Sequence, residues 1–451
     1  MYPKADINSS HTYIPDTRSV DCHSIIDRYH HEDIDQKPEE PIHDGEAYWT
    51  EGIRNPGWLT VAGTWLACFV CAGTVSSWGV FQAEYTKIFS NEVAVSFIGS
   101  TALSIEMLGI LTTPLIRRVG VRYTMLIGAL IATVALILAT FAKELWQLFV
   151  MQGLMYGLGL CLVFNASVML PSEWFVKNRA LANGIAWTGS TIGPMVSANA
   201  FQALLTTFGR QITLGIMAGI VFTLTLVAAI LSRPRYPMHS SNKKVANGDQ
   251  ACSEECSKES LLSIPYIAIL FFSFAYPFHW ETVFFLAPTY AQYVGASPTL
   301  AASTLTIIFG MTTISRIVFG FVADRCGRLN FLSIALSINA IFIMTLWQYA
   351  DTIPMFLSFC VLLGTWGGFC PNMRPVIVSD LVGMKKAQKA VYVSYMFSLP
   401  SALVGDPFIS YIYSRYGWTA AIQTIGLFGA CSAIAILTLR FLTNKRLFAV
   451  V

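Results

Sequence analysis

Long apolar runs dominate this chain, and their length limits most strongly how it can fold. Twelve runs follow one another, each close to the roughly 20 residues that cross a bilayer core. They lie near 58–82, 94–116, 123–141, 146–169, 180–206, 211–232, 264–290, 299–322, 329–349, 354–379, 388–412 and 418–441. Hydrocarbon offers no partner to unpaired backbone groups, so each run is expected to be helical. The sequence predicts an all-α polytopic membrane protein with twelve transmembrane helices.

The composition supports a membrane environment. Only 12% of the residues are charged, whereas a soluble domain carries roughly 25%. Hydrophobic residues make up 54% of the chain, and aromatic residues 13%. An ordinary soluble globule is excluded because it needs charged residues over most of its surface. We expect the lipid bilayer as a partner and no nucleic acid.

The distribution of Lys and Arg predicts the orientation. If the N-terminus is cytosolic, the inside loops and the C-terminal end hold eighteen basic residues, and the outside loops hold four. Basic residues accumulate on the cytosolic side of membrane proteins. Both termini are therefore predicted to be cytosolic. The cell membrane is the expected location, although the residues do not distinguish it from an internal membrane.

Three polar segments divide the chain. Residues 1–56 hold 12 acidic and 5 basic side chains and are predicted to be a disordered cytosolic tail. A polar linker at 233–263 separates six-helix halves at 57–232 and 264–441, and residues 442–451 form a second cytosolic tail. The scattered His and Cys residues do not have the spacing of a metal site, and no cofactor motif is found.

A short repeat indicates that the halves are duplicated. Arg117-Arg118-Val119-Gly120 corresponds to Asp324-Arg325-Cys326-Gly327, 207 positions later. Tyr85 and Tyr290 are 205 positions apart. Duplicated halves are the architecture in which one half rocks against the other around a central site.

The second copy of this repeat extends over residues 320–328, Gly-Phe-Val-Ala-Asp-Arg-Cys-Gly-Arg. It looks like the GxxxDRxGR loop motif of the major facilitator superfamily, which implies that fold and a gating role. The gating candidates are Gly320, Asp324, Arg325, Gly327 and Arg328. Glycine permits close helix approach, and an aspartate can meet an arginine or a helix N-terminus. A basic loop that only sets topology is the alternative. In the first copy, Arg117 replaces the acidic residue, so we do not expect a charge-paired lock there.

A second resemblance involves residues 173–190, Glu-Trp-Phe-Val-Lys-Asn-Arg-Ala-Leu-Ala-Asn-Gly-Ile-Ala-Trp-Thr-Gly-Ser. This stretch is similar to one in the monocarboxylate porter family. Residues 77–82 and 286–291 also look like the fungal branch of that family. The resemblance covers about residues 57 to 441. Fungal members often export the products of biosynthetic pathways, so the resemblance implies export.

Ionisable residues inside the apolar runs are the candidates for substrate binding or coupling, because a charge at mid-helix costs roughly 2.5–3.5 kcal/mol even on a lenient scale. They are Glu106, His279, Glu281, Arg316, Arg374 and Asp406. His279 and the two glutamates are candidates for proton exchange. Static packing is the alternative for each of them, and Arg374 can also extend toward the cytosolic boundary.

Arg316 matches a membrane arginine that monocarboxylate porters use for the substrate carboxylate and for coupling. A guanidinium binds a carboxylate with two parallel hydrogen bonds, so an anionic substrate is chemically sensible. Thr312 replaces the partner acid expected one turn earlier, and Ser76 replaces a lysine of animal members, so proton-coupled lactate transport does not follow. Asn165 and Trp78 are further candidates to line the passage.

The predicted function is secondary active transport of a small organic molecule or anion by alternating access, as an efflux carrier for a secondary metabolite. The alternative is proton-linked uptake of a monocarboxylate or a vitamin-like nutrient. No catalytic constellation such as HExxH occurs, so an enzyme is not expected. The chain has no GxxxxGK[ST] loop, which disfavours an ATP-driven pump.

Overall fold

The computed structural model describes residues 54–89, 92–235 and 263–443. All described residues belong to one compact unit, which spans Thr50–Val451. The predicted N-terminal tail, most of the predicted linker and most of the C-terminal tail lie outside the described residues. The described part is helical almost throughout, as the sequence predicts.

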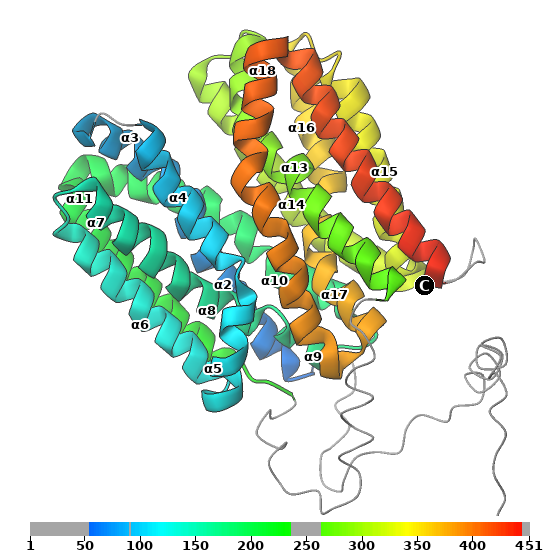
Figure 1. The fold of residues 1–451 in the computed structure, drawn as a ribbon, viewed down its shortest axis with the longest axis horizontal. Helices are drawn as coiled ribbons and strands as arrows, with labels where there is room; N and C mark the ends of the chain where they lie inside the picture. Colours follow the sequence, from blue (N-terminus) through cyan, green and yellow to red (C-terminus); the bar gives the residue numbers. More distant parts are fainter. Residues whose placement is uncertain (1–53, 90–91, 236–262, 444–451) are drawn as a thin grey trace, which may run out of the picture. The chain divides into compact units, whose positions relative to one another are not determined.

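Two sets of helices follow one another along the chain (Figure 1). The first helical group comprises α2 (Gly57–Ser76), α3 (Trp78–Phe89), α4 (Glu92–Glu106), the 3-10 helix η1 (Gly109–Leu111), α5 (Thr112–Val119), α6 (Val121–Thr140), α7 (Leu145–Leu148), the π-helix η2 (Phe149–Met155), α8 (Tyr156–Ser167), α9 (Leu170–Trp174), α10 (Arg179–Trp187) and α11 (Gly189–Leu231). The second helical group comprises α13 (Ile264–Tyr293), α14 (Pro298–Cys326), α15 (Arg328–Phe342), the π-helix η4 (Ile343–Trp347), α16 (Ile353–Gly367), α17 (Cys370–Val382) and α18 (Met384–Thr443).

The number of helices that can span a membrane depends on how bent helices are divided. By length and composition, the described residues form nine such helices, or ten if the bent pair Phe97–Glu106 and Gly109–Val119 is one span. This differs from the predicted twelve because α11 and α18 each contain two helices that meet at a kink, at Gly209 and Gly417. If the bent pair is taken as one span and both helices are divided at these glycines, the ten helices become twelve segments that correspond to the twelve predicted runs.

Glycines with positive φ repeat between the two groups. Gly120 (φ 87°) precedes α6, and Gly327 (φ 94°) precedes α15, 207 positions later. The kinks at Gly209 (φ 73°) and Gly417 (φ 83°) are 208 positions apart. Residues with a Cβ rarely adopt this backbone conformation, so glycine is needed at these turns. The two groups thus reverse direction in the same way at corresponding positions.

Several helices are interrupted inside the bundle. The α4–η1 connection bends by 53° after Glu106. Short breaks separate α8 from α9, α10 from α11 at Thr188, and α16 from α17 at 368–369. Interrupted helices in membranes are tolerated where the freed backbone groups are buried in protein or line a cavity. These breaks therefore mark places where backbone carbonyls become available to side chains.

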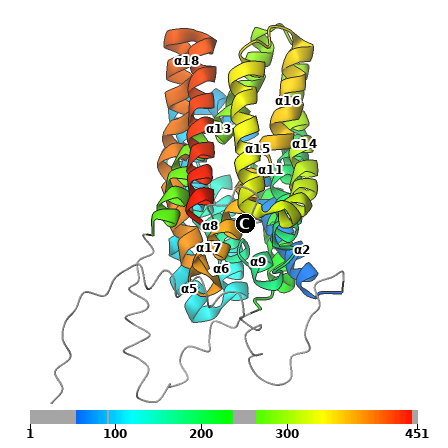
Figure 2. The ribbon, with the colours of Figure 1, turned by 90° about the vertical axis from the view of Figure 1, so that its right-hand side faces the viewer.

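The two helical groups meet through a limited set of elements. Within the first group α2 packs on α11, and within the second group α13 packs on α18. Between the groups, α10 contacts α14 and α17, α11 contacts α14, and α18 contacts α4 and η1. Near one end of the helices, α9 and α17 contact each other, and both views place them at that end (Figure 1, Figure 2).

Candidate functional site

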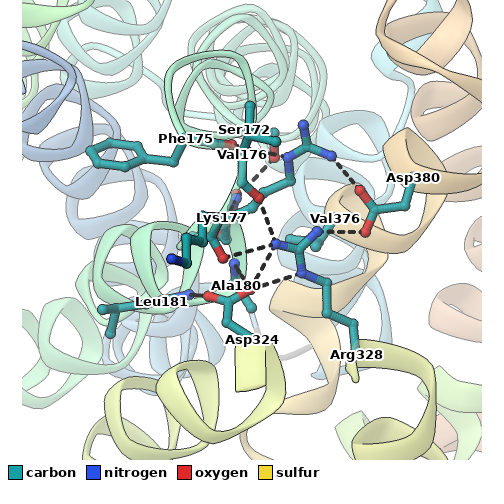
Figure 3. Close-up of polar contacts among 12 residues, drawn as sticks. Ser172, Phe175, Val176, Lys177, Ala180, Leu181, Asp324, Arg328, Val376 and Asp380 are labelled. Carbon is teal, nitrogen blue, oxygen red and sulfur yellow. Dashed lines mark hydrogen bonds and ion pairs between the residues drawn. The ribbon is translucent and has the colours of Figure 1, made fainter. Parts of the chain in front are cut away.

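The first part of the candidate site lies where α14 meets the beginning of α10 (Figure 3). The Asp324 carboxylate accepts hydrogen bonds from the backbone N–H groups of Ala180, at 3.1 Å, and Leu181, at 2.9 Å. The first N–H groups of a helix have no partner within that helix and carry partial positive charge. Asp324 of the second group therefore caps a helix of the first group.

The backbones of α10 and α14 lie close together, so the Asp324 side chain can reach the start of α10. A Cβ on Gly320 would lie 2.9 Å from the carbonyl oxygen of Ala180. A Cβ on Gly184, further along α10, would collide with the carbonyl oxygen of Arg316 in α14. Larger side chains at these two positions would push α10 and α14 apart. The predicted role of Gly320 in close helix packing agrees with this geometry.

Arg328 extends the contact to a third helix. Its Nε donates to Asp324 Oδ1 at 2.8 Å, its Nη1 donates to Asp380 Oδ2 at 2.8 Å, and its Nη2 donates to the carbonyl of Val176 at 2.8 Å (Figure 3). The other oxygen of Asp380 pairs with Arg179 at the start of α10. We call Asp324, Arg328, Asp380 and Arg179 the closing network, because it joins the two helical groups at one end.

Two members of the closing network were not predicted as gating residues. Asp380 of α17 has no motif around it, and Arg179 was identified only as part of a family-like stretch. Of the predicted gating residues, Gly327 forms the turn between α14 and α15. The Arg325 guanidinium lies 3.8 Å from the centre of the Phe321 ring. This contact lies within α14, because both residues belong to that helix.

Arg316 connects the groups deeper in the interface. Its side chain is buried, and Nη1 donates to the Trp187 carbonyl and, at 2.7 Å, to Ser190 Oγ of the first group. Its Nε donates to the carbonyl of Gly368 in the second group at 3.0 Å. Trp187 and Ser190 flank the break between α10 and α11, and Gly368 lies in the break between α16 and α17. Helix breaks in both groups therefore supply acceptors to one guanidinium.

The two glutamates belong to the same region. Glu106 is buried at the bend that ends α4, and its carboxyl group interacts electrostatically with that of Glu281 in α13. The Asn165 side-chain amide donates to the Glu106 carbonyl at 2.8 Å. Tyr392 of α18 donates to the Asn165 carbonyl at 2.6 Å. Glu106, Asn165 and Glu281, all predicted from the sequence, thus lie near the contact between the groups.

Arg374 in α17 is also buried. Its Nη1 donates to Ser398 Oγ at 2.8 Å, and its guanidinium lies 5.0 Å from the centre of the Tyr395 ring. It interacts electrostatically with Glu281. The alternative that Arg374 extends toward the end of its helix is wrong, since its partners hold it inside the bundle.

The remaining predicted residues lie elsewhere. His279 is fully buried within the second group, where its Nε2 lies 3.0 Å from Asn339 Nδ2 of α15. Trp78 packs within the first group, against Gly99 and the ring of Tyr85. Asp406 falls in α18, and its side chain lies outside the described part of the structure. The structure does not bring His279 or Trp78 together with the two arginines.

Long apolar helices in two groups, with buried ionisable side chains at their contact, define a multi-pass membrane protein. The model of the Major Facilitator Superfamily matches residues 62–312 and 269–447, so the chain belongs to this superfamily. Its members are transporters and not enzymes. The predicted family is confirmed, and with it the all-α polytopic fold.

Relatives and solved structures agree with this assignment. The chain is 29% identical over 334 residues to the "Uncharacterized transporter ESBP6" of Saccharomyces cerevisiae, covering 72% of this chain but only 50% of that protein. It is 24% identical over 425 residues to "Monocarboxylate transporter 12" of Homo sapiens, covering 86% and 81%. The structure resembles that of the proton:xylose symporter XylE, with a TM-score of 0.66, 12% identity and 85% and 95% coverage. The structural likeness concerns the fold alone.

Proposed function

We propose that this protein is a secondary transporter that exports a small organic anion, a product of secondary metabolism, by alternating access. The observation that carries the proposal is Arg316, a buried cation that binds backbone carbonyls of both helical groups at their helix breaks. Ionisable residues inside a membrane are expensive and mark solute or ion pathways. Export is the direction expected from the resemblance to the fungal branch.

We place the protein in the cell membrane with both termini in the cytosol. The end that bears Asp324 then faces the cytosol, and the closing network holds that end shut in the described conformation. Cargo can enter from the cytosol only after this network separates. Separation also breaks the bonds from Arg316 to Trp187 and Ser190, and the released guanidinium can then bind a carboxylate through two parallel hydrogen bonds.

A proton is the proposed coupling ion. Glu106 and Glu281 come from different helical groups and interact electrostatically, so rocking of the groups changes the surroundings of both carboxyl groups. Protonation of this pair can therefore be linked to which side is open. His279 stays a predicted proton site, within the second group.

Uptake into liposomes tests the proposal. Purified protein is reconstituted, and a mixture of organic acids is offered with and without a pH gradient. We expect accumulation of at least one acid that stops when the gradient is dissipated, and weaker transport by Arg316→Lys. Arg440→Lys is a matched control because Arg440 is a buried arginine outside the interface, bonded to Asn330. No solute movement by the parent protein would reject transport, and indifference to the gradient would reject proton coupling.

The second candidate is proton-linked uptake of a monocarboxylate or vitamin-like nutrient. Similarity to a protein named as a monocarboxylate transporter favours it. In this chain, however, Thr312 stands one turn before Arg316, where the monocarboxylate porters have an acid. Its hydroxyl donates to the Gly364 carbonyl at 3.3 Å. Metabolite profiling of cells with and without the gene separates the two directions. A product that accumulates inside cells lacking the gene supports export, and a nutrient depleted inside supports uptake.

A further inference from the structure

Three buried polar side chains near the contact between the helical groups have polar atoms without a hydrogen-bond partner in the described structure. They are Arg374 at Nε, Tyr395 at its hydroxyl and Trp187 at Nε1. Their exposed fractions are 6%, 3% and 8%. Buried polar groups are nearly always paired, because an unpaired group loses its bonds to water. The arginine and tryptophan nitrogens can only donate, and the tyrosine hydroxyl can donate or accept, so a ligand with acceptor atoms can satisfy all three.

The three side chains are connected through aromatic contacts. The Arg374 guanidinium lies 5.0 Å from the centre of the Tyr395 ring, and that ring meets Phe164 edge-on at 6.1 Å. Phe164 in turn meets Trp187 edge-on at 5.6 Å. Arg374 and Tyr395 belong to the second group, whereas Phe164 and Trp187 belong to the first. We call these four residues the Arg374 cluster.

The Arg374 guanidinium is held by a hydrogen bond at Nη1, whereas its buried Nε has no hydrogen-bond partner in the described structure. Its Nη1 donates to Ser398 Oγ at 2.8 Å, and Ser398 donates to the Ser273 carbonyl at 2.8 Å. The ring centre of Phe272, a residue of α13, lies 5.7 Å from the Arg374 guanidinium. Glu281 of α13 interacts electrostatically with Arg374. The Nε edge is thus held in place without an acceptor.

Arg316 differs from Arg374 in the hydrogen-bond acceptors that surround its guanidinium. It donates to Trp187, Ser190 and Gly368, which are protein acceptors from both groups. While this end of the bundle is closed, Arg316 is occupied in holding the groups together. Arg374 on α17, in contrast, has a buried Nε without a hydrogen-bond partner among the described residues.

We propose that Arg374 and Tyr395 bind the carboxylate of an organic acid that carries an aromatic ring. A guanidinium edge and a hydroxyl can together donate to the two oxygens of one carboxylate. Phe164 and Trp187 pack against the ring of the ligand, because aromatic rings favour edge-on and offset contacts. This inference rests on the proposed function and narrows its cargo to aromatic monocarboxylates, with Arg374 as the residue that selects the acid.

The test compares three small probes with the full-length purified protein in detergent. Phenylacetate has the ring and the charge, 2-phenylethanol has the ring without the charge, and acetate has the charge without the ring. Titration calorimetry gives the dissociation constant of each. We expect phenylacetate to bind at least about tenfold more tightly than either partial probe, since a hydrogen-bonded charge pair changes affinity by about that factor. Equal affinities for phenylacetate and 2-phenylethanol would overturn the proposal.

Variants assign the binding to the cluster. Arg374→Gln is expected to lose the preference for the acid over the alcohol, and Arg374→Lys to keep part of it, because lysine retains the charge without the fork. Tyr395→Phe removes only a hydroxyl and should weaken phenylacetate about three- to tenfold. Arg440→Gln, which removes a buried arginine of the same group, should bind as the parent does. If Arg374→Gln does not fold, an unchanged affinity in Tyr395→Phe still contradicts the proposal.

Transport of the same probes separates this inference from the proposed function. If liposomes accumulate other acids and phenylacetate affinity does not depend on Arg374, the protein is a transporter and the cluster is not its carboxylate site. If phenylacetate binds in an Arg374-dependent way and no solute crosses the membrane, the site stands and the transport proposal fails. Absence of phenylacetate binding to the parent protein overturns the substrate class.

Discussion

The two copies of the loop motif share a backbone and differ in their charges. Gly120 and Gly327 have φ values of 87° and 94° and connect consecutive helices in the same way. Asp324 of the second copy corresponds to Arg117 of the first, and Arg328 corresponds to Val121. The contacts of Asp324 and Arg328 with the opposite helical group therefore cannot be reproduced in the first copy with these side chains.

The repeat therefore preserves the backbone turn and does not preserve the charged side chains. The turn needs only a residue that tolerates positive φ, so glycine is sufficient in both copies. The contact between the groups needs a carboxylate at the N-terminus of α10 and a guanidinium beside it. Arg117 and Arg118 are exposed in the first copy. The closing network is consequently one-sided, because of the two motif copies only the second contributes to it, through Asp324 and Arg328.

Asp324→Asn is expected to have the largest effect, an increase in the population that is open at the end of the bundle bearing Asp324. The variant removes the charge that pairs with Arg328 and caps α10, interactions that typically contribute about 1.5–3 kcal/mol. The open population at this end should rise about tenfold or more. The measurement is the rate at which a single cysteine at Thr191, which bonds Thr313 across the interface, reacts with an impermeant maleimide.

Arg117→Ala is the matched control for this prediction. It removes the charge at the corresponding position of the first copy, where the side chain is exposed. We expect no change in the labelling rate at Thr191→Cys. A comparable increase in both variants would mean that the two copies contribute equally, contrary to the one-sided network.

The next largest effect is a loss of stability when the glycine of either turn is replaced. Gly120→Ala and Gly327→Ala should each lower stability by about 1 kcal/mol or more, because alanine is strained at these φ values. Thermal unfolding in one detergent measures both. Gly215→Ala is the control, since a Cβ at this position of α11 meets nothing within 4 Å and alanine favours helices. A loss in one copy only would show that the turns are not equivalent.

The smallest effect is expected for Asp380→Asn. Asp380 is 36% exposed, so water and salt screen its pairs with Arg179 and Arg328, and the loss should stay below about 1 kcal/mol. The same labelling assay should show a small increase that shrinks as ionic strength rises. The effect of Asp324→Asn should persist in salt, because Asp324 is only 4% exposed. An equal salt response in both variants would contradict this ranking.

Sequence reasoning found part of the closing network and missed the rest for a definable reason. Asp324, Arg328 and Gly320 belong to a spaced motif, and their types indicate a helix contact. Asp380 is an isolated acid at the end of an apolar run, and nothing nearby identifies Arg179 as its partner. Pairing between residues 201 positions apart depends on how α10 and α17 pack.

The central residues show a similar limit. His279 and Glu281 were predicted together, but two residues along a helix rotate a side chain by roughly 200°, so they point to different neighbours. His279 contacts Asn339 within the second group, whereas Glu281 interacts with Glu106 of the first. Trp187 and Tyr395 are two aromatic residues among many, and only their unpaired polar atoms and buried contacts distinguish them.

The sequence by itself determined the membrane helices and their approximate limits, because apolar length must match the thickness of the bilayer and backbone groups must be paired within it. It also determined the family and the repeat that puts Gly120 and Gly327 at corresponding positions. Tertiary structure decided which buried side chains meet. That outcome depends on the rotation of each helix and on breaks such as those at Thr188 and Gly368, which aim carbonyls at Arg316. Neither the rotation nor the aim is encoded in hydrophobic length or in the spacing of one motif.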